Sequence, residues 1–469
     1  MAARSESGLV EDESVERFGY RQELQRSLSF RDLLVYGLIF MVPIAPFGIF
    51  GSVFSASGGM VALAYVVGGI GMAFTALSYA EMARAFPMAG SVYTYAGRGI
   101  HPAVGFLAGW QILLDYILVP ALLYVVSAAA LHSLVSEVPI WVWVAFFVVV
   151  NTLVNSLGIQ FTARFNLGML VAELIVLALF CGIGIAALVG GEGRGFSFDP
   201  IYNPDTFSVG IVFTAVSVAV LSFLGFDGIA TLAEENRESA RRIGRAMLMG
   251  LTVAAVLFIL QTWIAALLVP NPQKLIAQGD AAGTSFYDAA EVAGGHWLNV
   301  TTAVATAIAW GIANALAAQA ATSRLLFAMA RDRQLPHFLA RVNERRRVPI
   351  NATLLVAVLS LGMGIWMSER DDGITLLSTL VNFGALSAFL LLHLSVLRHY
   401  GMGRAGVPLN PWRHVVAPLI GAVIIGYVMV KADVAAKTVG LVWLGVGLVV
   451  LVGLQVAGRR PDVAALEEA

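Results

Sequence analysis

The chain has 469 residues, of which 58% are hydrophobic and only 13% are charged, about half the charged share of an ordinary soluble domain. Its formal net charge of -1 provides no basic field for nucleic acid, and its single cysteine, Cys181, excludes an internal disulfide framework. The mean hydropathy is +0.81. Together with 47 glycines, this composition excludes a soluble enzyme and is typical of a protein whose helices cross a membrane many times.

Twelve apolar stretches follow a polar amino-terminal segment. Residues 1–31 carry six acids and five arginines without an apolar block, which predicts a cytoplasmic tail and not a signal peptide or a spanning helix. Most of the stretches have about the 20 residues needed to cross a bilayer, and they are apolar on all sides, which predicts helices and not barrel strands. The stretches are residues 30–53, 59–84, 101–131, 139–157, 165–190, 206–235, 245–270, 297–326, 348–367, 373–398, 414–431 and 436–457.

The basic residues test this topology, because Lys and Arg are retained on the cytoplasmic side of membrane proteins. With the amino terminus inside, 24 of the 29 basic residues fall in cytoplasmic segments and 5 fall outside. Seven of the 24 are the arginines from Arg324 to Arg347, which we interpret as part of this retention signal. We therefore expect an all-α protein of twelve transmembrane helices in the cytoplasmic membrane, with both termini in the cytoplasm.

Two of the stretches contain residues that interrupt helices at mid-membrane depth. The first holds Pro43, Pro46, Gly48 and Gly51, and the sixth holds Asp227 between glycines. Prolines remove backbone donors and glycines tolerate non-helical dihedrals, so both helices are expected to unwind, with a simple proline kink as the alternative in the first. Paired breaks in two five-helix halves are typical of an inverted-repeat transporter with a midplane site, where half-helix ends suit a zwitterion or an amine.

Several motifs of the chain resemble those of one protein family and occur in the same order along the sequence. The motif segments are Leu77–Glu81, Phe86–Tyr95, Gly105–Trp110, Leu114–Tyr116, Gly225–Asp227, Ala233–Glu235, Ser323–Asp332 and Leu335–Pro336. From about residue 28 to 400 the chain resembles the amino acid, polyamine and organocation (APC) superfamily of permeases. Within it, Leu114–Tyr116 and Phe223–Gly228 look most like the putrescine and amino acid importer branch.

The resemblance implies a five-plus-five inverted repeat of the LeuT type, with discontinuous helices 1 and 6 and two extra helices. The expected parts are a tail (1–29), a transporter core (30–400) with repeats at about 30–190 and 206–400, helices 11 and 12 (401–457), and a cytoplasmic tail (458–469). Amino acid permeases of this type usually carry Gly-x-Gly in the first break. Here Phe47 and Phe50 flank single glycines, which predicts a bulkier and more apolar cradle.

The predicted substrate site gathers residues from both breaks and from the third stretch. Asp227 would pair with a substrate amine or cap the second half-helix, and Tyr116 would stack on or hydrogen-bond the substrate. Phe223 and Phe226 are either gate aromatics or ordinary packing residues. The full set is Ala45, Phe47, Gly48, Ile49, Gly51, Tyr116, Phe223, Gly225, Phe226 and Asp227.

Acids inside a membrane are costly unless they are paired, hydrated or neutral, so each is a functional candidate. For Asp115 we favour a role in tying helices together. Glu173 follows Asn166 by seven residues. In sodium-independent relatives the residue at this offset is a lysine, and its ammonium group takes the place that a sodium ion occupies in related carriers. The resemblance therefore implies a coupling position with reversed charge. Proton binding, a protonated structural group and cation binding remain open for Glu173.

Two more acids, Glu234 and Glu235, follow the sixth stretch close to Arg237, Arg241 and Arg242. They would match one end of an extended dication or, as we favour, form a solvated salt-bridge network at the membrane interface. The segment Asn271–Trp297 is expected to form an extracellular amphipathic helix over the entry.

Rival classes fit less well. The seven histidines lie mostly at the ends of stretches, without a metal-binding HExxH or an ATP-binding loop, so we expect no enzyme, cofactor or metal. A channel would need a ring of carbonyls or like charges. The sequence predicts a proton-coupled secondary transporter of amino acids or amines such as putrescine, monomeric or weakly homo-oligomeric, with an exchanger that moves no net protons as the alternative.

Overall fold

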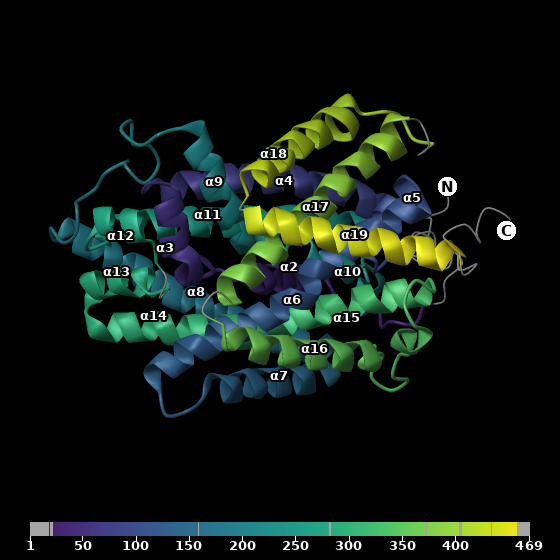
Figure 1. Cartoon of the computed structure of the whole chain (residues 1–469), viewed down its shortest axis with the longest axis horizontal. Helices are drawn as coiled ribbons and strands as arrows, with labels where there is room; N and C mark the ends of the chain where they lie inside the picture. Colours follow the sequence, from purple (N-terminus) through teal and green to yellow (C-terminus); the bar gives the residue numbers. More distant parts are fainter. Residues whose placement is uncertain are drawn as a thin grey trace, which may run out of the picture.

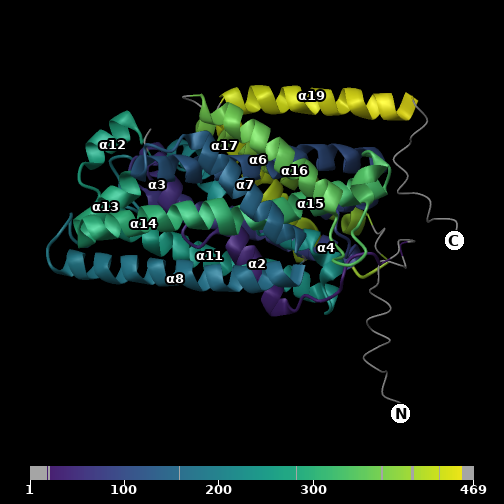
Figure 2. The same ribbon diagram turned by 90° about the horizontal axis from the view of Figure 1, so that it is seen from below.

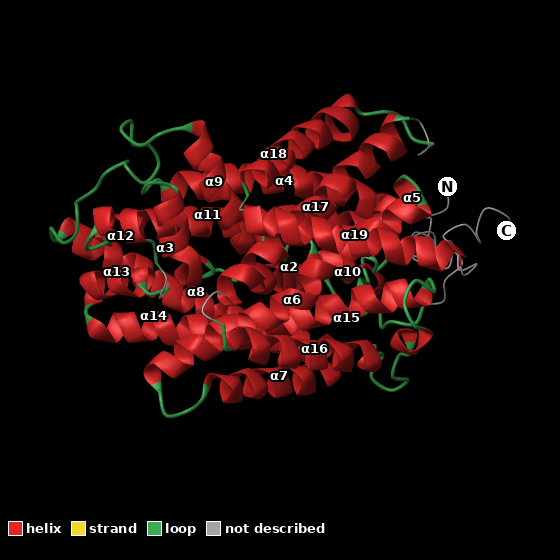
Figure 3. Ribbon diagram, viewed as in Figure 1, coloured by secondary structure: helices red, strands yellow, loops and turns green. Residues whose placement is uncertain are grey.

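The chain is all-helical in the part that the structure covers. The computed structural model describes residues 18, 22–157, 159–280, 283–370, 373–402, 406–432 and 434–456. Within these ranges there is no strand (Figure 3), and Leu28 and Asn236 form an isolated bridge. The predicted tail 458–469 and most of the predicted tail 1–29 lie outside the described residues.

Helices of regular α geometry account for most of the fold. Those before residue 210 are α2 (Phe30–Met41), α3 (Pro46–Ala56), α4 (Val61–Ala85), α5 (Ser91–Gly99), α6 (Pro102–Leu134), α7 (Ile140–Ser156), α8 (Ile159–Val189) and α9 (Val209–Ala219). Those after it are α10 (Gly228–Thr231), α11 (Ala240–Leu268), α12 (Pro272–Gln278), α13 (Ser285–Gly294), α14 (His296–Ile308), α15 (Ala315–Arg331), α16 (Ile350–Ser368), α17 (Gly373–Gly401), α18 (Ala417–Lys431) and α19 (Val434–Val456).

Short helices of other geometry connect or interrupt them. The 3-10 helices are η2 (Val220–Phe223), η3 (Ala233–Glu235) and η5 (His337–Ala340), and the π-helices are η4 (Ala309–Asn314) and η6 (Trp412–Val416).

The apolar helices make this a multi-pass membrane protein. Ten helical segments among the described residues are long and apolar enough to span a bilayer, and the bent pair α2–α3 adds another. The apolar α7, with 17 residues, is slightly shorter. Each of the twelve predicted stretches overlaps one of these segments.

The bundle is layered around α6. In α6 83% of the most apolar window is buried, whereas in α19 only 17% is buried, and α19 lies along the outside of the bundle (Figure 2). Figure 1 shows α12 and α13 at one end of the bundle and α5 at the other, with the last turns of α15 directed to the α5 end. These two ends are called the α13 end and the α5 end below.

The first predicted interruption is present between α2 and α3. Residues Val42–Ala45 leave the helix, the two axes differ by 53°, and Val42 has φ 53°. Pro46 begins α3, where its missing N–H removes no helical bond. The Nε2 atom of Gln261 donates a hydrogen bond to the freed carbonyl of Pro43 at 2.9 Å. This segment is called the first break.

The sixth predicted stretch is interrupted as well. After α9 and η2, residues Leu224–Asp227 are not helical, and α10 resumes at Gly228. Gly225 has φ +117°, and a Cβ there would lie 2.7 Å from the carbonyl carbon and oxygen of Phe40. Only glycine allows both this dihedral and this approach. The segment Leu224–Asp227, the second break, therefore lies directly against the end of α2.

Candidate substrate site

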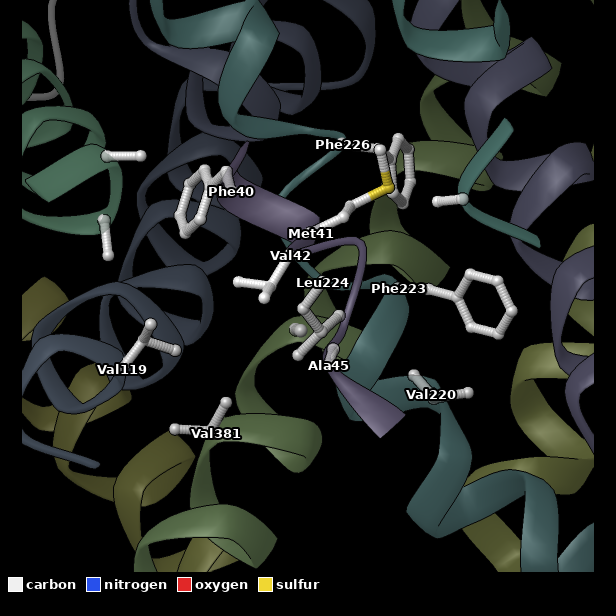
Figure 4. Packing of buried hydrophobic residues seen from close by; sticks show 14 of the residues in the cluster. Phe40, Met41, Val42, Ala45, Val119, Val220, Phe223, Leu224, Phe226 and Val381 are labelled. Atoms are coloured by element: carbon white, nitrogen blue, oxygen red, sulfur yellow. The ribbon is translucent and has the colours of Figure 1, made fainter. Parts of the chain in front are cut away.

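A closed cavity lies where the two breaks meet α6 and η4. Its volume of about 30 Å³ is enough for roughly one or two water molecules. Figure 4 shows the first break passing through the centre of this region, with Leu224 beside Ala45. The lining residues are Phe40, Met41, Ala45, Asp115, Val119, Leu122, Leu123, Leu221, Ser222, Leu224, Gly225, Trp310 and Asn314. We call it the central cavity.

Two of the predicted substrate residues, Ala45 and Gly225, line the central cavity. Phe223 and Phe226 do not, and in Figure 4 they lie on the other side of the first break from Phe40 and Val119. Both rings pack in aromatic clusters, with ring centroids 5.2 Å apart for Phe223 and Phe258, and 5.7 Å apart for Phe226 and Tyr79. Their geometry is that of packing residues.

Asp227 is buried beside the cavity and hydrogen-bonded within the protein. Its Oδ2 accepts a hydrogen bond from the Tyr116 hydroxyl at 2.6 Å, and its Oδ1 accepts one from the Gly225 N–H at 3.2 Å. Neither Asp227 nor Tyr116 lines the cavity. The pair therefore holds the second break against α6, which favours the structural alternative for Asp227.

The sequence suggested Asp227 as the acid that would meet a substrate amine, but the acid that lines the central cavity is Asp115. It is buried on α6 and lines the central cavity, and the described residues contain no hydrogen-bond partner for its carboxylate. The favoured role of tying helices together is therefore not seen for its side chain. Asp115 is the acid that faces the cavity.

Sequence reasoning missed the contribution of η4. This π-helical segment interrupts the eighth span and carries Trp310 and Asn314, which both line the cavity. The indole Nε1 of Trp310 and the Oδ1 of Asn314 are buried without a hydrogen-bond partner in the part of the chain that the structure describes. Asn151 Nδ2 donates to the Gly311 carbonyl at 2.8 Å, so a neighbouring helix supports the π turn. An amide inside an apolar stretch was the available signal, while a π turn leaves no comparable mark in sequence.

The predicted residues of α3 lie between the cavity and the α13 end. The Phe47 ring stacks on Phe286 of α13 with centroids 3.9 Å apart, and Phe50 and Phe180 complete an aromatic cluster. We call these four residues the lid. Phe47 and Phe50 follow the cavity residue Ala45 closely and pack on α13, so the cluster lies between the central cavity and α13.

The other α3 residues pack against neighbours and do not line the cavity. A Cβ on Gly48 would lie 3.0 Å from the Trp310 indole, and one on Gly51 would overlap the Asp280 side chain. Ile49 is half-buried. The N–H groups of Phe47 and Gly48 donate to carbonyls within the first break, so they are already engaged. The expected extracellular segment contains two helices, α12 and α13.

Two buried ion pairs join helices near the α5 end. Glu235 receives hydrogen bonds from Arg324 Nε at 2.7 Å and Nη2 at 3.1 Å. Glu234 receives them from Arg331 Nη2 at 2.7 Å and Nη1 at 2.9 Å. We call these pairs the latch, since they join η3 to α15.

The latch corrects two expectations about these acids. Their partners are on α15 and are not Arg237, Arg241 or Arg242. The acids are also not solvated, because only 2% of Glu234 and 1% of Glu235 is exposed. Sequence proximity suggested the nearest arginines, whereas the fold brings α15 across the end of α10.

Glu173 lies on α8 away from the central cavity. It is 3% exposed, and neither carboxylate oxygen has a hydrogen-bond partner among the described residues. Asn166, two helical turns earlier, is fully buried, and both of its amide atoms lack a partner in the same part of the chain. Residues seven apart lie on one face of a helix, so α8 presents two unsatisfied polar side chains to the interior.

A multi-pass helical protein with a closed cavity between two interrupted helices has the form of a membrane transporter. The chain matches the family model for amino acid permeases over residues 33–451 and belongs to that family. It is an APC superfamily permease of the putrescine and amino acid branch, which confirms the resemblance, and it is a transporter of amino acids or amines.

Three relatives show the range of the family. The low-affinity putrescine importer PlaP of Escherichia coli is 30% identical over 446 residues, which cover 94% of this chain and 96% of the relative. The branched-chain amino acid permease BcaP of Bacillus subtilis is 27% identical, with 92% of this chain and 93% of the relative covered. The methylthioribose transporter of the same species is 24% identical, with the same two shares covered.

The latch predicts that replacing a buried arginine lowers the free energy of unfolding much more than replacing an exposed one. Arg324→Gln leaves Glu235 as an uncompensated buried charge and should lower the free energy of unfolding by about 3–5 kcal/mol. Chemical denaturation of purified protein in detergent measures this loss. The matched control is Arg242→Gln, because Arg242 pairs with Glu238 at 3.2 Å with 44% of its side chain exposed; its loss should be about 0–1 kcal/mol. The double variant Arg324→Gln/Glu235→Gln should recover part of the stability. Equal losses in the two single variants would contradict the assignment.

Proposed function

We propose that this permease imports a small organic cation such as putrescine by alternating access, in symport with protons. The central cavity carries the proposal, because it lies where the two breaks meet and is lined by one carboxylate, Asp115, together with two polar atoms of η4 that have no partner among the described residues. The lid and the latch lie on opposite sides of it. Opening one while the other stays closed exposes the cavity to one side of the membrane at a time.

The proposed topology has twelve transmembrane helices in the cytoplasmic membrane and both termini inside. The first break and the second break occupy corresponding positions of two five-helix halves, which supports the inverted repeat. The distribution of basic residues puts the lid outside and the latch in the cytoplasm. Residues 30–400 would form the transporter core and 401–457 the two additional helices.

The chemistry of the cavity supports an amine as substrate. Among the described lining residues one is acidic and none is Lys, Arg or His. The N–H groups of Phe47 and Gly48, which a substrate carboxylate would need, already donate to carbonyls. Val119, Leu122 and the other apolar wall residues suit a methylene chain. One end of a diamine would pair with Asp115, and the Oδ1 of Asn314, which is a hydrogen-bond acceptor, would meet the amine at the other end.

The small cavity volume implies that substrate enters only when the breaks move. A space for roughly one or two waters cannot hold a diamine. Gly225 of the second break lies against Phe40 at the end of α2, and both breaks line the central cavity, so movement of one half-helix shifts the wall formed by the other. This contact couples occupation of the cavity to the state of the lid and the latch.

Glu173 is the proposed proton site. A buried carboxylate without partners favours its neutral form, and α8 packs against both α2 and α11, the helices that hold the first break. A shift of α2 that admits water to α8 would let Glu173 release its proton, which links proton movement to the cycle. A carrier that exchanges substrates without net proton movement would not need this group.

Asp115→Asn should abolish uptake of labelled putrescine while reducing uptake of a neutral amino acid much less, because only the amine loses its counter-charge. Uptake into proteoliposomes measures both. The matched variant is Asp227→Asn, which keeps a hydrogen-bond acceptor for Tyr116 and should reduce both substrates to a similar extent. Loss of putrescine uptake in Asp227→Asn alone, with Asp115→Asn active, would place the amine site at Asp227 instead.

Glu173→Gln should flatten the pH dependence of putrescine uptake and remove accumulation driven by an inward proton gradient, while exchange of internal for external putrescine continues. The pH profile between about 5 and 8 in proteoliposomes measures the effect. Glu192→Gln, which changes an exposed acid in the loop after α8, is the control and should retain the wild-type profile. An unchanged profile in Glu173→Gln would exclude Glu173 as the proton site and favour the exchanger.

A further inference from the structure

A second, larger cavity lies at the α5 end, between the ends of the helices that surround the core. Its volume is about 630 Å³, which is in the range of ligand sites. The end of α4, the start of α11, the end of α17 and the segment before α18 form its walls. It shares no lining residue with the central cavity. We call it the side cavity.

Positive charge dominates this cavity. Its lining contains three arginines, Arg84, Arg241 and Arg413, and a single carboxylate, Glu81. Glu81 is shared, since its Oε2 lies 3.3 Å from Arg84 Nη1 and its Oε1 lies 3.7 Å from Arg413 Nη1. Arg241 is exposed and has no ion pair among the described residues. The single carboxylate leaves an excess of positive charge, which favours an anion.

The floor of the cavity is held rigidly. His414 Nε2 lies 3.6 Å from Glu81 Oε2, and the His414 ring stacks on Tyr400 with centroids 4.2 Å apart. The Tyr400 hydroxyl donates to the Glu81 carbonyl at 3.0 Å. These contacts join α4, α17 and η6, so the arginines are presented from a preorganised surface.

The segment from Val407 to Trp412 gives this cavity an exposed apolar rim. Val407 lines it, and Leu409 and Trp412 follow in the same segment with 52% and 54% of their surface exposed. Trp412 begins η6, at the end of an apolar span, and tryptophan at that level is typical of the membrane–water interface. Acyl chains can therefore lie against this rim while a charged group enters the cavity.

We propose that the side cavity binds the phosphate headgroup of an anionic phospholipid. Arginine guanidinium groups match phosphate oxygens in geometry as well as charge, and basic pockets between helix ends are suited to lipid headgroups. A soluble phosphate would use the same arginines but would gain nothing from the apolar rim. The bound lipid would join α4 to α17 and α18, independently of the substrate that the central cavity takes.

The test compares lipids that differ only in the headgroup. Dioleoyl phosphatidylglycerol, added to the purified full chain in detergent, should raise the apparent melting temperature more than dioleoyl phosphatidylcholine does. Arg84→Gln/Arg413→Gln should increase the phosphatidylglycerol concentration needed for half of the effect by about fivefold for each arginine removed. The control Arg341→Gln/Arg345→Gln removes two exposed arginines outside the side cavity and should respond as wild type.

Arg241→Gln provides a second variant that does not disturb Glu81. It should raise the phosphatidylglycerol concentration needed for half of the effect by about fivefold. This measurement remains possible even where the double variant fails to fold. Equal stabilisation by the two lipids, or a wild-type response from Arg241→Gln, would overturn the proposal. An equal gain from inorganic phosphate or glycerol phosphate would also overturn it, because the site would then be one for a soluble anion.

Discussion

The fold depends on satisfying the backbone groups that two interrupted helices release inside an apolar medium. Non-helical backbone survives at that depth only where it is buried in protein or lines a cavity. Here Gln261 donates a hydrogen bond to the carbonyl of Pro43, and Asp227 accepts one from the N–H of Gly225. The second break then packs through Gly225 against Phe40 at the end of α2, and both breaks line the same cavity. The central cavity exists because these two irregular segments meet.

The acids of the core illustrate three ways of placing a carboxylate in such a medium. Asp227 is satisfied by hydrogen bonds, and Glu234 and Glu235 are satisfied by arginines. Asp115 lines the central cavity, and Glu173 has no hydrogen-bond partner among the described residues. The first two arrangements maintain structure. The third leaves acids without a permanent partner in the protein. Their charge would be neutralised by a substrate amine at Asp115 and by a proton at Glu173, which is the basis of the two proposed sites.

The sequence was informative wherever one residue type decides the outcome. Prolines and glycines predicted both breaks, and apolar length predicted the helices, because these effects are local. The partners of the acids are decided by helices distant in sequence. Glu234 and Glu235 were therefore expected near Arg237, Arg241 and Arg242, although they pair with Arg331 and Arg324. Trp310 and Asn314 were missed for the same reason, since a π turn in the eighth span brings them to the cavity.

The central claim is that one cavity opens to each side of the membrane in turn, and cysteine accessibility tests it most directly. Val119 lines the cavity, and the native Cys181 is buried and can be replaced by serine. In proteoliposomes of Val119→Cys/Cys181→Ser, a membrane-impermeant thiol reagent should label the cysteine from either side, and putrescine should slow the labelling. Labelling from one side only under all conditions, or from neither side during transport, would contradict the account.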